Sequence, residues 1–312
     1  MRAKLRNFAA GSIQLRLSNQ QLGYALGLAG VLMFGATLPA TKLAIPAMDP
    51  LFVTAMRASI AGITSVALLL IMRRPLPPRA LWLPLLLTGT CTIIGFPLFM
   101  SLAAVTVPAA HGGVVLGIMP IATVAAATLV TNERPSLGFW LASIAGASIV
   151  VYFVLSNGDA QGDAHGISAG DLYLLGTVMA GGFAYAMSGK LSRLMPGWEV
   201  ISWQVAAFLP FSALAVLLTW PSGLADVPWS AWGGLAYIGL ISQYGAFFVF
   251  NAAMALGGVA RIGQFIMLQP FIVVALAAPV NGEPIRLSTI FYAVLVVATV
   301  IAGQYMRVLH KK

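Results

Sequence analysis

The sequence predicts an all-α integral membrane protein with ten transmembrane helices, arranged as two inverted five-helix repeats. Three observations lead to this fold class. The chain of 312 residues is 60 % hydrophobic and only 8 % charged, whereas soluble domains carry about 25 % charged residues. Its apolar residues form ten runs long enough to cross a bilayer. Residues 150 positions apart also match over much of the two halves.

The ten predicted spans are runs of roughly 20 mostly apolar residues, which is the length that a membrane-crossing helix needs. Polar or helix-breaking segments such as RRPLPPRA and WPSGLADVP separate them. We place the spans at 22–44, 50–72, 81–104, 109–131, 136–155, 171–191, 198–220, 229–255, 260–280 and 286–307. This predicts an N-terminal tail (1–21), a first repeat (22–155), a linker (156–170), a second repeat (171–307) and a C-terminal tail (308–312).

The distribution of charge predicts how the spans are oriented. If the N-terminal tail is cytoplasmic, only Lys42, Arg57 and Arg286 of the 17 basic residues lie outside the cytoplasmic segments. Retention of basic loops in the cytoplasm explains this asymmetry, so the net charge of +9 does not indicate nucleic acid. We therefore expect an inner (plasma) membrane protein of bacterial type with both termini cytoplasmic. Most acidic residues fall on the outer, periplasmic side: Asp49, Asp159, Asp163, Asp171, Asp226 and Glu283.

The internal repeat relates two glutamates, one in TNERPS and one in NGEP. Glu133 and Glu283 lie 150 positions apart, and the same offset relates Gly89 to Gly239 and Gly95 to Gly245. Five spans per repeat is an odd number, so the second repeat must enter the membrane upside down. Inverted repeats are typical of secondary transporters, whose substrate site lies near the midplane between the repeats.

Two interpretations of the repeated glutamates stay open. Each precedes a span, where a carboxylate can cap the exposed N–H groups of the helix. Glu133 and Glu283 would alternatively act as gates that latch one face each. Pro120 and Pro270 also share the 150-residue offset, and each removes a helical hydrogen bond inside a span. They would act as hinges or serve packing alone.

Four motifs carry a resemblance to a known family: FGATLPATK at 34–42, DPLFVTAMRAS at 49–59, TNERPS and NGEP. With the ten spans in two halves, they make the chain resemble the drug/metabolite transporter superfamily, and its EamA-type branch in particular. Within that branch the chain is similar to the YddG-type exporters of aromatic amino acids. The resemblance implies a central cavity ringed by helices 1–4 and 6–9, alternating access, and export of hydrophobic amino acids.

Polar and aromatic residues inside the spans are the candidate substrate contacts. A buried polar group in hydrocarbon is costly unless it is paired, so such groups mark either helix contacts or a solute path. Tyr244, Phe248 and Asn251 recur at i, i+4 and i+7 on one predicted helix face. Aromatic, Met and amide side chains together suit an apolar or zwitterionic small molecule. The full set is Thr37, Thr41, Ser101, His111, Tyr185, Tyr244, Phe248, Asn251, Gln264 and Met267.

Arg57 is unusual because it lies about two helical turns, or roughly 10 Å, into the second span. It would extend toward the interface, bind the carboxylate of a substrate or hold a gate. We group it with Glu133, Glu283, Pro120 and Pro270 as gating or structural residues.

Missing features narrow the function further. No predicted span has an acidic residue near its centre, so proton relays of the usual kind are not expected and we predict a facilitator. The sequence has no HExxH motif and no phosphate-binding loop, so we expect neither an enzyme nor a cofactor or metal. A lipid-handling membrane enzyme or flippase and a proton-coupled exporter are the alternatives. The expected partners are a small-molecule substrate and the lipid bilayer, and the oligomeric state stays open.

Overall fold

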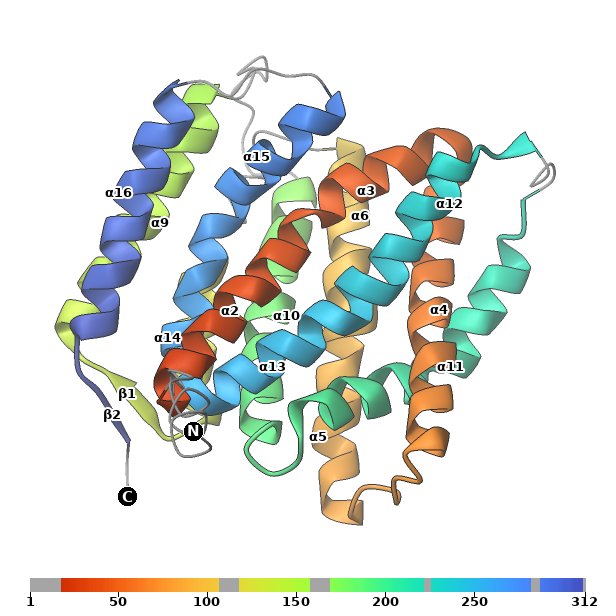
Figure 1. Cartoon of the computed structure of the whole chain (residues 1–312), viewed down its shortest axis with the longest axis horizontal. Coiled ribbons are helices and arrows are strands. Elements are labelled where there is room, and N and C mark those ends of the chain that lie inside the picture. The colour runs from red at the N-terminus through yellow and green to blue at the C-terminus, as the bar shows by residue number, and fades with distance from the viewer. Residues whose placement is uncertain (1–17, 107–117, 158–168, 222–225, 282–286, 311–312) are drawn as a thin grey trace, which may run out of the picture.

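The structure is a computed structural model that describes residues 18–106, 118–157, 169–221, 226–281 and 287–310. It is helical apart from two short strands (Figure 1). In the described residues, seven helices are long and apolar enough to cross a membrane, and three further apolar helices are shorter. Each of the ten predicted spans overlaps one of these helices. The prediction of an all-α membrane protein is thus confirmed.

The first half of the chain forms helices whose starts follow from local sequence. Ser18 and Gln21 make a capping box at the first helix, and the Asp49 carboxylate accepts hydrogen bonds from Leu51 N and Phe52 N at the start of α4. The elements are α2 (Asn19–Gly35), α3 (Thr37–Ala44), η1 (Ile45–Ala47), α4 (Pro50–Ile71), α5 (Arg79–Gly89), η2 (Thr90–Gly95), α6 (Phe96–Thr106), α8 (Met119–Val130), β1 (Glu133–Pro135) and α9 (Leu137–Asn157).

The second half repeats several features of the first. Its elements are α10 (Ala169–Leu191), α11 (Gly197–Leu218), α12 (Trp229–Ala236), η4 (Tyr237–Gly245), α13 (Ala246–Gly257), α14 (Val259–Gly263), η5 (Gln264–Leu268), α15 (Gln269–Asn281), α16 (Leu287–Tyr305) and β2 (Val308–His310). Both η2 and η4 are π-helical, and they end at Gly95 and Gly245, which the sequence pairs at the 150-residue offset. Such π-helical segments often mark functional sites.

Helix packing follows the predicted repeat. Helix α2 packs along α13 just as α10 packs along α6, while α4 pairs with α11 and α9 with α16. The α9–α16 pair lies at one side of the molecule (Figure 1). Backbones approach closely where α2 meets α13, because a Cβ added at Gly23 would lie 2.8 Å from the nitrogen of Gly257. Small residues permit this kind of contact between membrane helices.

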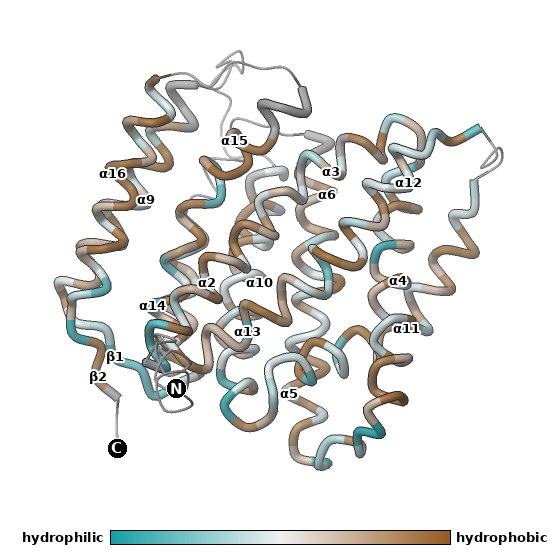
Figure 2. The backbone as a smooth tube through the Cα atoms, in the orientation of Figure 1, coloured by the Kyte–Doolittle hydropathy of each residue, from teal (hydrophilic) through white to brown (hydrophobic). Residues whose placement is uncertain are grey.

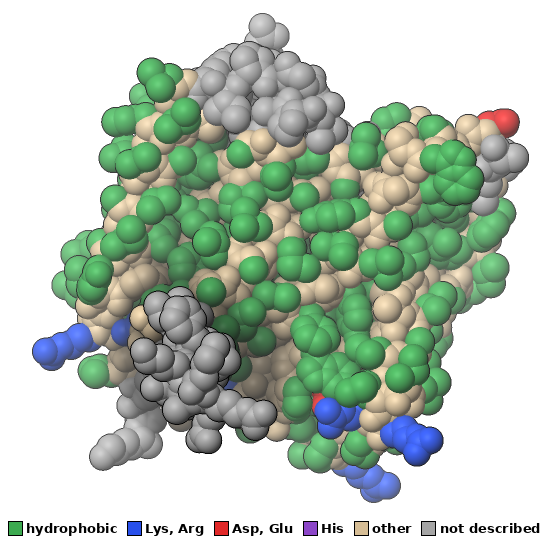
Figure 3. All heavy atoms as spheres, in the orientation of Figure 1, with side chains coloured by type: hydrophobic (Ala, Val, Ile, Leu, Met, Phe, Trp, Pro, Cys, Tyr) green, Lys and Arg blue, Asp and Glu red, His purple; other side chains and the backbone are tan. Residues whose placement is uncertain are grey.

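Charged residues gather at one end of the helices, which we call the basic face. It carries residues at the end of α4, the start of α5, the end of α10, α14 and the end of α16: Arg73, Arg74, Arg79, Arg193, Arg261 and Arg307. Figure 2 shows hydrophobic residues along the helices and hydrophilic ones near the turns. Figure 3 shows Lys and Arg side chains at the lower end of a largely hydrophobic surface. Helices α4 and α12 begin at the opposite face (Figure 1).

Candidate functional site

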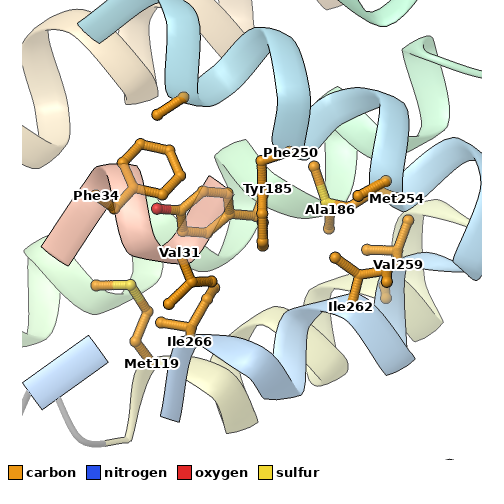
Figure 4. Close-up of a cluster of buried hydrophobic side chains, with 13 residues drawn as sticks. Val31, Phe34, Met119, Tyr185, Ala186, Phe250, Met254, Val259, Ile262 and Ile266 are labelled. Atoms are coloured by element: carbon orange, nitrogen blue, oxygen red, sulfur yellow. The ribbon is translucent and has the colours of Figure 1, made fainter. Parts of the chain in front are cut away.

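Four aromatic rings meet where helices from both halves converge, and we call them the central cluster: Phe34 on α2, Tyr185 on α10, and Phe247 and Phe250 on α13. The centroid of the Phe34 ring lies 4.9 Å from that of Phe247 and 6.3 Å from that of Tyr185. Figure 4 shows Phe34, Tyr185 and Phe250 side by side, with Met119 of α8 nearby. Edge-to-face rings of this kind form a well-packed apolar surface.

Beside the central cluster, the first span is broken. Helix α2 ends at Gly35 and α3 starts at Thr37, with Ala36 between them at φ −77° and ψ −3°. Across this break, the hydroxyls of Thr37 and Ser242 share a hydrogen bond of 2.7 Å, and the Tyr237 hydroxyl donates to the Met33 carbonyl at 3.0 Å. These bonds satisfy groups next to the break and join α2–α3 to η4. Thr41 instead bonds within its own helix, to the carbonyl of Thr37.

The predicted face of the eighth span points toward α11 and not toward the central cluster. The Tyr244 hydroxyl lies 2.6 Å from Ser202 Oγ, Phe248 stacks on Trp198, and Asn251 Nδ2 donates to the Gly197 carbonyl at 3.2 Å. The three residues do share a face, as their spacing predicted. The spacing says nothing about which neighbour that face meets, and the adjacent face presents the rings of the central cluster instead.

Gln264 and Met267 also face away from the central cluster, and their assignment as substrate contacts stays a prediction. Gln264 Nε2 donates to Ser143 Oγ at 2.8 Å, and Gln264 Oε1 accepts from Gln304 Nε2 at 3.2 Å. Met267 packs among buried residues of α9 and α16. Both side chains point toward α9 and α16 because they lie in the 3₁₀ segment η5. In a 3₁₀ helix, side chains three residues apart point in the same direction.

Glu133 makes several polar contacts at the basic face. Its side chain is only 1 % exposed, and Oε1 accepts from both Arg193 Nη2 and the Val259 amide. Oε2 accepts from the Ala260 amide at 2.8 Å. One of the two open interpretations was a cap on the helix that follows Glu133, but the carboxylate instead accepts from the first amides of α14, 126 residues further along the chain. Gly258 makes this possible, because its φ of +88° turns the first amides of α14 toward the carboxylate.

The turn that holds Glu133 is also paired with the C-terminal end of the chain. Strand β1 runs antiparallel to β2, with Glu133 opposite His310, and the Ser136 amide donates to the Arg307 carbonyl at 2.9 Å. We call Glu133, Arg193 and the start of α14 the basic-face latch. The latch joins α8 and α10 to the ninth predicted span, so it ties parts of both halves together.

The remaining predicted residues have varied surroundings. His111 and Glu283 lie outside the described residues, and Ser101 lies in α6 but its side chain is not described. Pro120 is at the start of α8, and Pro270 follows η5 at the start of α15. The ninth span is therefore irregular just before its proline. The Arg57 Nε atom is buried without a hydrogen-bond partner.

Sequence reasoning missed several groups that the structure brings to prominence. Phe34, Phe247 and Phe250 look like ordinary span residues, and only their convergence with Tyr185 distinguishes them. Gln204 on α11 is 1 % exposed, yet both of its amide atoms lack a hydrogen-bond partner. The sequence did contain a signal for Gln204, because it places a polar amide side chain inside a predicted span. Among the described residues, no group of His, Cys, Asp or Glu could hold a metal ion.

The fold is that of a multi-pass, all-α membrane protein, and comparison with known proteins identifies its family. The chain belongs to the EamA-like transporter family, whose model matches residues 21–155 and again 168–302. It is 36 % identical over 282 residues to the uncharacterized transporter YdeK of Bacillus subtilis (strain 168), covering 90 % of this chain and 96 % of that protein. A solved crystal structure shares the fold at a TM-score of 0.73 and 19 % identity, covering 90 % of this chain and 96 % of that one.

Proposed function

We propose that the protein is a secondary transporter that exports small metabolites, most of all aromatic and other hydrophobic amino acids. The observation that carries this proposal is the central cluster, where α2 of one half meets α10 and α13 of the other. Aromatic side chains at such a junction, with a few polar groups close by, suit an amphipathic solute. Transport at a junction between two repeats is also the usual arrangement in secondary transporters.

The proposed mechanism is alternating access between two inverted five-helix repeats, spanning the membrane ten times. The units are 22–155 and 171–307, joined by the linker 156–170 and flanked by tails at 1–21 and 308–312. The basic face is cytoplasmic by the positive-inside rule, in an inner (plasma) membrane. The basic-face latch closes the cytoplasmic side, and its release opens that side to the solute. Glu283, Pro120 and Pro270 are its proposed counterpart and hinges.

Uptake by proteoliposomes tests the substrate class. Purified protein would be offered labelled phenylalanine, tryptophan, methionine and threonine, with and without Tyr185→Ala. The matched control is Phe153→Ala, which removes a buried ring that packs on Phe271 in the cluster between α9 and α16. We expect saturable uptake by the wild type and the control, and loss in Tyr185→Ala. Absence of uptake of every amino acid by folded wild-type protein would refute the proposal.

The same vesicles test whether the protein is a facilitator. No acidic residue lies near the centre of a predicted span, and a facilitator needs none. Equilibration of labelled solute without accumulation is expected under an imposed proton gradient. Accumulation against the solute gradient would establish proton coupling instead.

A lipid-handling function is the second candidate, and an apolar groove favours it. The groove has a volume of about 470 Å³ and lies between α3, α12 and α15, with Pro39, Leu43 and Leu276 among its lining residues. Such a surface would accept an acyl chain. Movement of a fluorescent phospholipid between the leaflets, in vesicles that show no amino acid uptake, would support this function over amino acid export.

A further inference from the structure

Among their polar side chains, helices α4 and α11 carry two with buried, unpaired atoms at equivalent positions in the two halves. Both helices contain 22 residues, Pro50–Ile71 and Gly197–Leu218. Arg57 is the eighth residue of the first and Gln204 the eighth residue of the second. At 1.5 Å per residue, each lies about 10 Å from the start of its helix. Because α4 begins at the opposite face and α11 at the basic face (Figure 1), the two residues occupy the two sides of the membrane region.

The neighbours of these two positions are equivalent as well. A Cβ added at Gly239 would lie 3.3 Å from the Arg57 carbonyl oxygen, and one added at Gly89 would lie 3.5 Å from Gln204 Cβ. Gly89 and Gly239 are 150 residues apart. Gly239 is part of the π-helical segment η4, and Gly89 directly precedes the π-helical segment η2. Each of the two positions therefore packs against a glycine of the opposite half that lies in or directly beside a π-helical segment.

Both side chains have buried polar atoms without a partner. Arg57 Nε has none, and neither Nε2 nor Oε1 of Gln204 has one. Leaving a buried polar group unsatisfied is unfavourable, because the group loses its hydrogen bonds to water and gains none in the protein. If these side chains had a structural role, their buried polar atoms would need hydrogen-bond partners within the protein. If they bind a solute, the same atoms are unpaired until the solute is present. Their equivalent placement in both halves makes chance packing a poor explanation.

We infer that Arg57 and Gln204 are equivalent solute-contacting residues, one nearer each face of the membrane region, and that Arg57 selects solutes that carry a carboxylate. This inference rests on the proposed transport function. A guanidinium pairs with a carboxylate through charge-assisted hydrogen bonds, whereas an amide offers only a neutral NH₂ donor group and a neutral acceptor oxygen. The preference for carboxylates therefore arises at the opposite face, where Arg57 lies. At the basic face, Gln204 binds the polar end of the solute and discriminates less between charged and neutral groups.

The test compares phenylalanine with phenylalaninamide, which lacks the carboxylate, as competitors of labelled phenylalanine applied to each side of oriented proteoliposomes. The variants are Arg57→Gln, Arg57→Lys, Gln204→Leu and the exchange Arg57→Gln/Gln204→Arg. We expect wild-type protein to prefer phenylalanine at least tenfold at the opposite face. Arg57→Gln should lose this preference, Arg57→Lys should keep most of it, and Gln204→Leu should raise KM tenfold at the basic face alone.

The exchange variant provides the sharpest outcome, because it keeps the total charge and moves the cation to the other half. The carboxylate preference should then move to the basic face. Unchanged discrimination in Arg57→Gln, with uptake retained, would overturn this inference and leave the proposed transport function standing. Absence of uptake of every solute by folded wild-type protein would overturn both. Size-exclusion profiles and thermal midpoints identify variants that fail to fold. If Arg57→Gln is one of them, loss of the carboxylate preference in folded Arg57→Lys, which keeps the positive charge, would overturn the inference.

Discussion

Replacing Glu133 by Gln should release the basic-face latch without unfolding the protein. The carboxylate accepts from Arg193 and from two backbone amides of α14. A Gln side chain keeps one acceptor oxygen and turns an NH₂ group toward a donor, so the ion pair and one amide bond are lost. The position is 1 % exposed, and the group that replaces the carboxylate oxygen therefore has little access to water.

The size of the effect follows from these contacts. Hydrogen bonds to a charged group contribute about 1.5–3 kcal/mol each. The Arg193 side chain is 33 % exposed, so water can solvate its guanidinium in the variant and offset part of the lost interaction energy. We therefore expect the closed state of the basic face to lose about 2–3 kcal/mol relative to the open state. The open population should rise roughly 30- to 150-fold.

A buried reporter cysteine measures this population. Ala127 lies in α8, is 0 % exposed and belongs to the buried cluster that also contains Val259. In a protein with Cys91→Ser, Ala127→Cys should react with a maleimide at a rate proportional to the open population. Glu133→Gln should raise that rate roughly 30- to 150-fold.

The matched control is Asp49→Asn, because that carboxylate also accepts two backbone amides but caps only its own helix at the opposite face. The labelling rate in Asp49→Asn should stay within about twofold of the parent, which corresponds to less than about 0.5 kcal/mol. Equal labelling rates in Glu133→Gln and the parent, with both proteins folded, would refute the latch.

Three further substitutions test other parts of the structure. Gly258→Ala forces a side chain onto a φ of +88°, which should destabilise the start of α14 by about 1–3 kcal/mol and raise labelling of the same reporter; unchanged labelling and unfolding would contradict the strain. Thr37→Val and Ser242→Ala should show a coupling of about 0.6–1.7 kcal/mol in a double-mutant cycle of unfolding, and additivity would exclude their hydrogen bond. Gln264→Leu should lower the thermal midpoint while leaving KM for transport unchanged, in contrast to Gln204→Leu, and a raised KM would instead support Gln264 as a substrate contact.

Much of the fold could be predicted because the rules of the membrane act locally along the chain. A helix must satisfy its own backbone in hydrocarbon, so apolar runs of about 20 residues are sufficient to locate the spans. The repeat was visible for a similar reason, since residues such as Gly95 and Gly245 occupy equivalent places. The basic face agrees with the predicted clustering of Lys and Arg in alternate joints.

The candidate site was predictable only in part. Tyr185 was identified from its place in a span, but its partners Phe34, Phe247 and Phe250 were not, because aromatic residues are common in every span. The predicted face of the eighth span met α11. Periodicity identifies a face of a helix, whereas the neighbour that the face meets depends on the tilt and rotation of both helices.

The sequence by itself determined the membrane location, the spans, the repeat and the gathering of basic residues at one end, because each depends on composition or on a fixed offset along the chain. Only the tertiary structure decided what Glu133 binds. Its partners Arg193 and Val259 lie 60 and 126 residues away, and neither distance carries a pattern. The π-helical segments and the 3₁₀ segment η5 likewise redirect side chains by changing the helical period. Side-chain direction depends on such local changes and on long-range packing, and both arise only when the whole chain has folded.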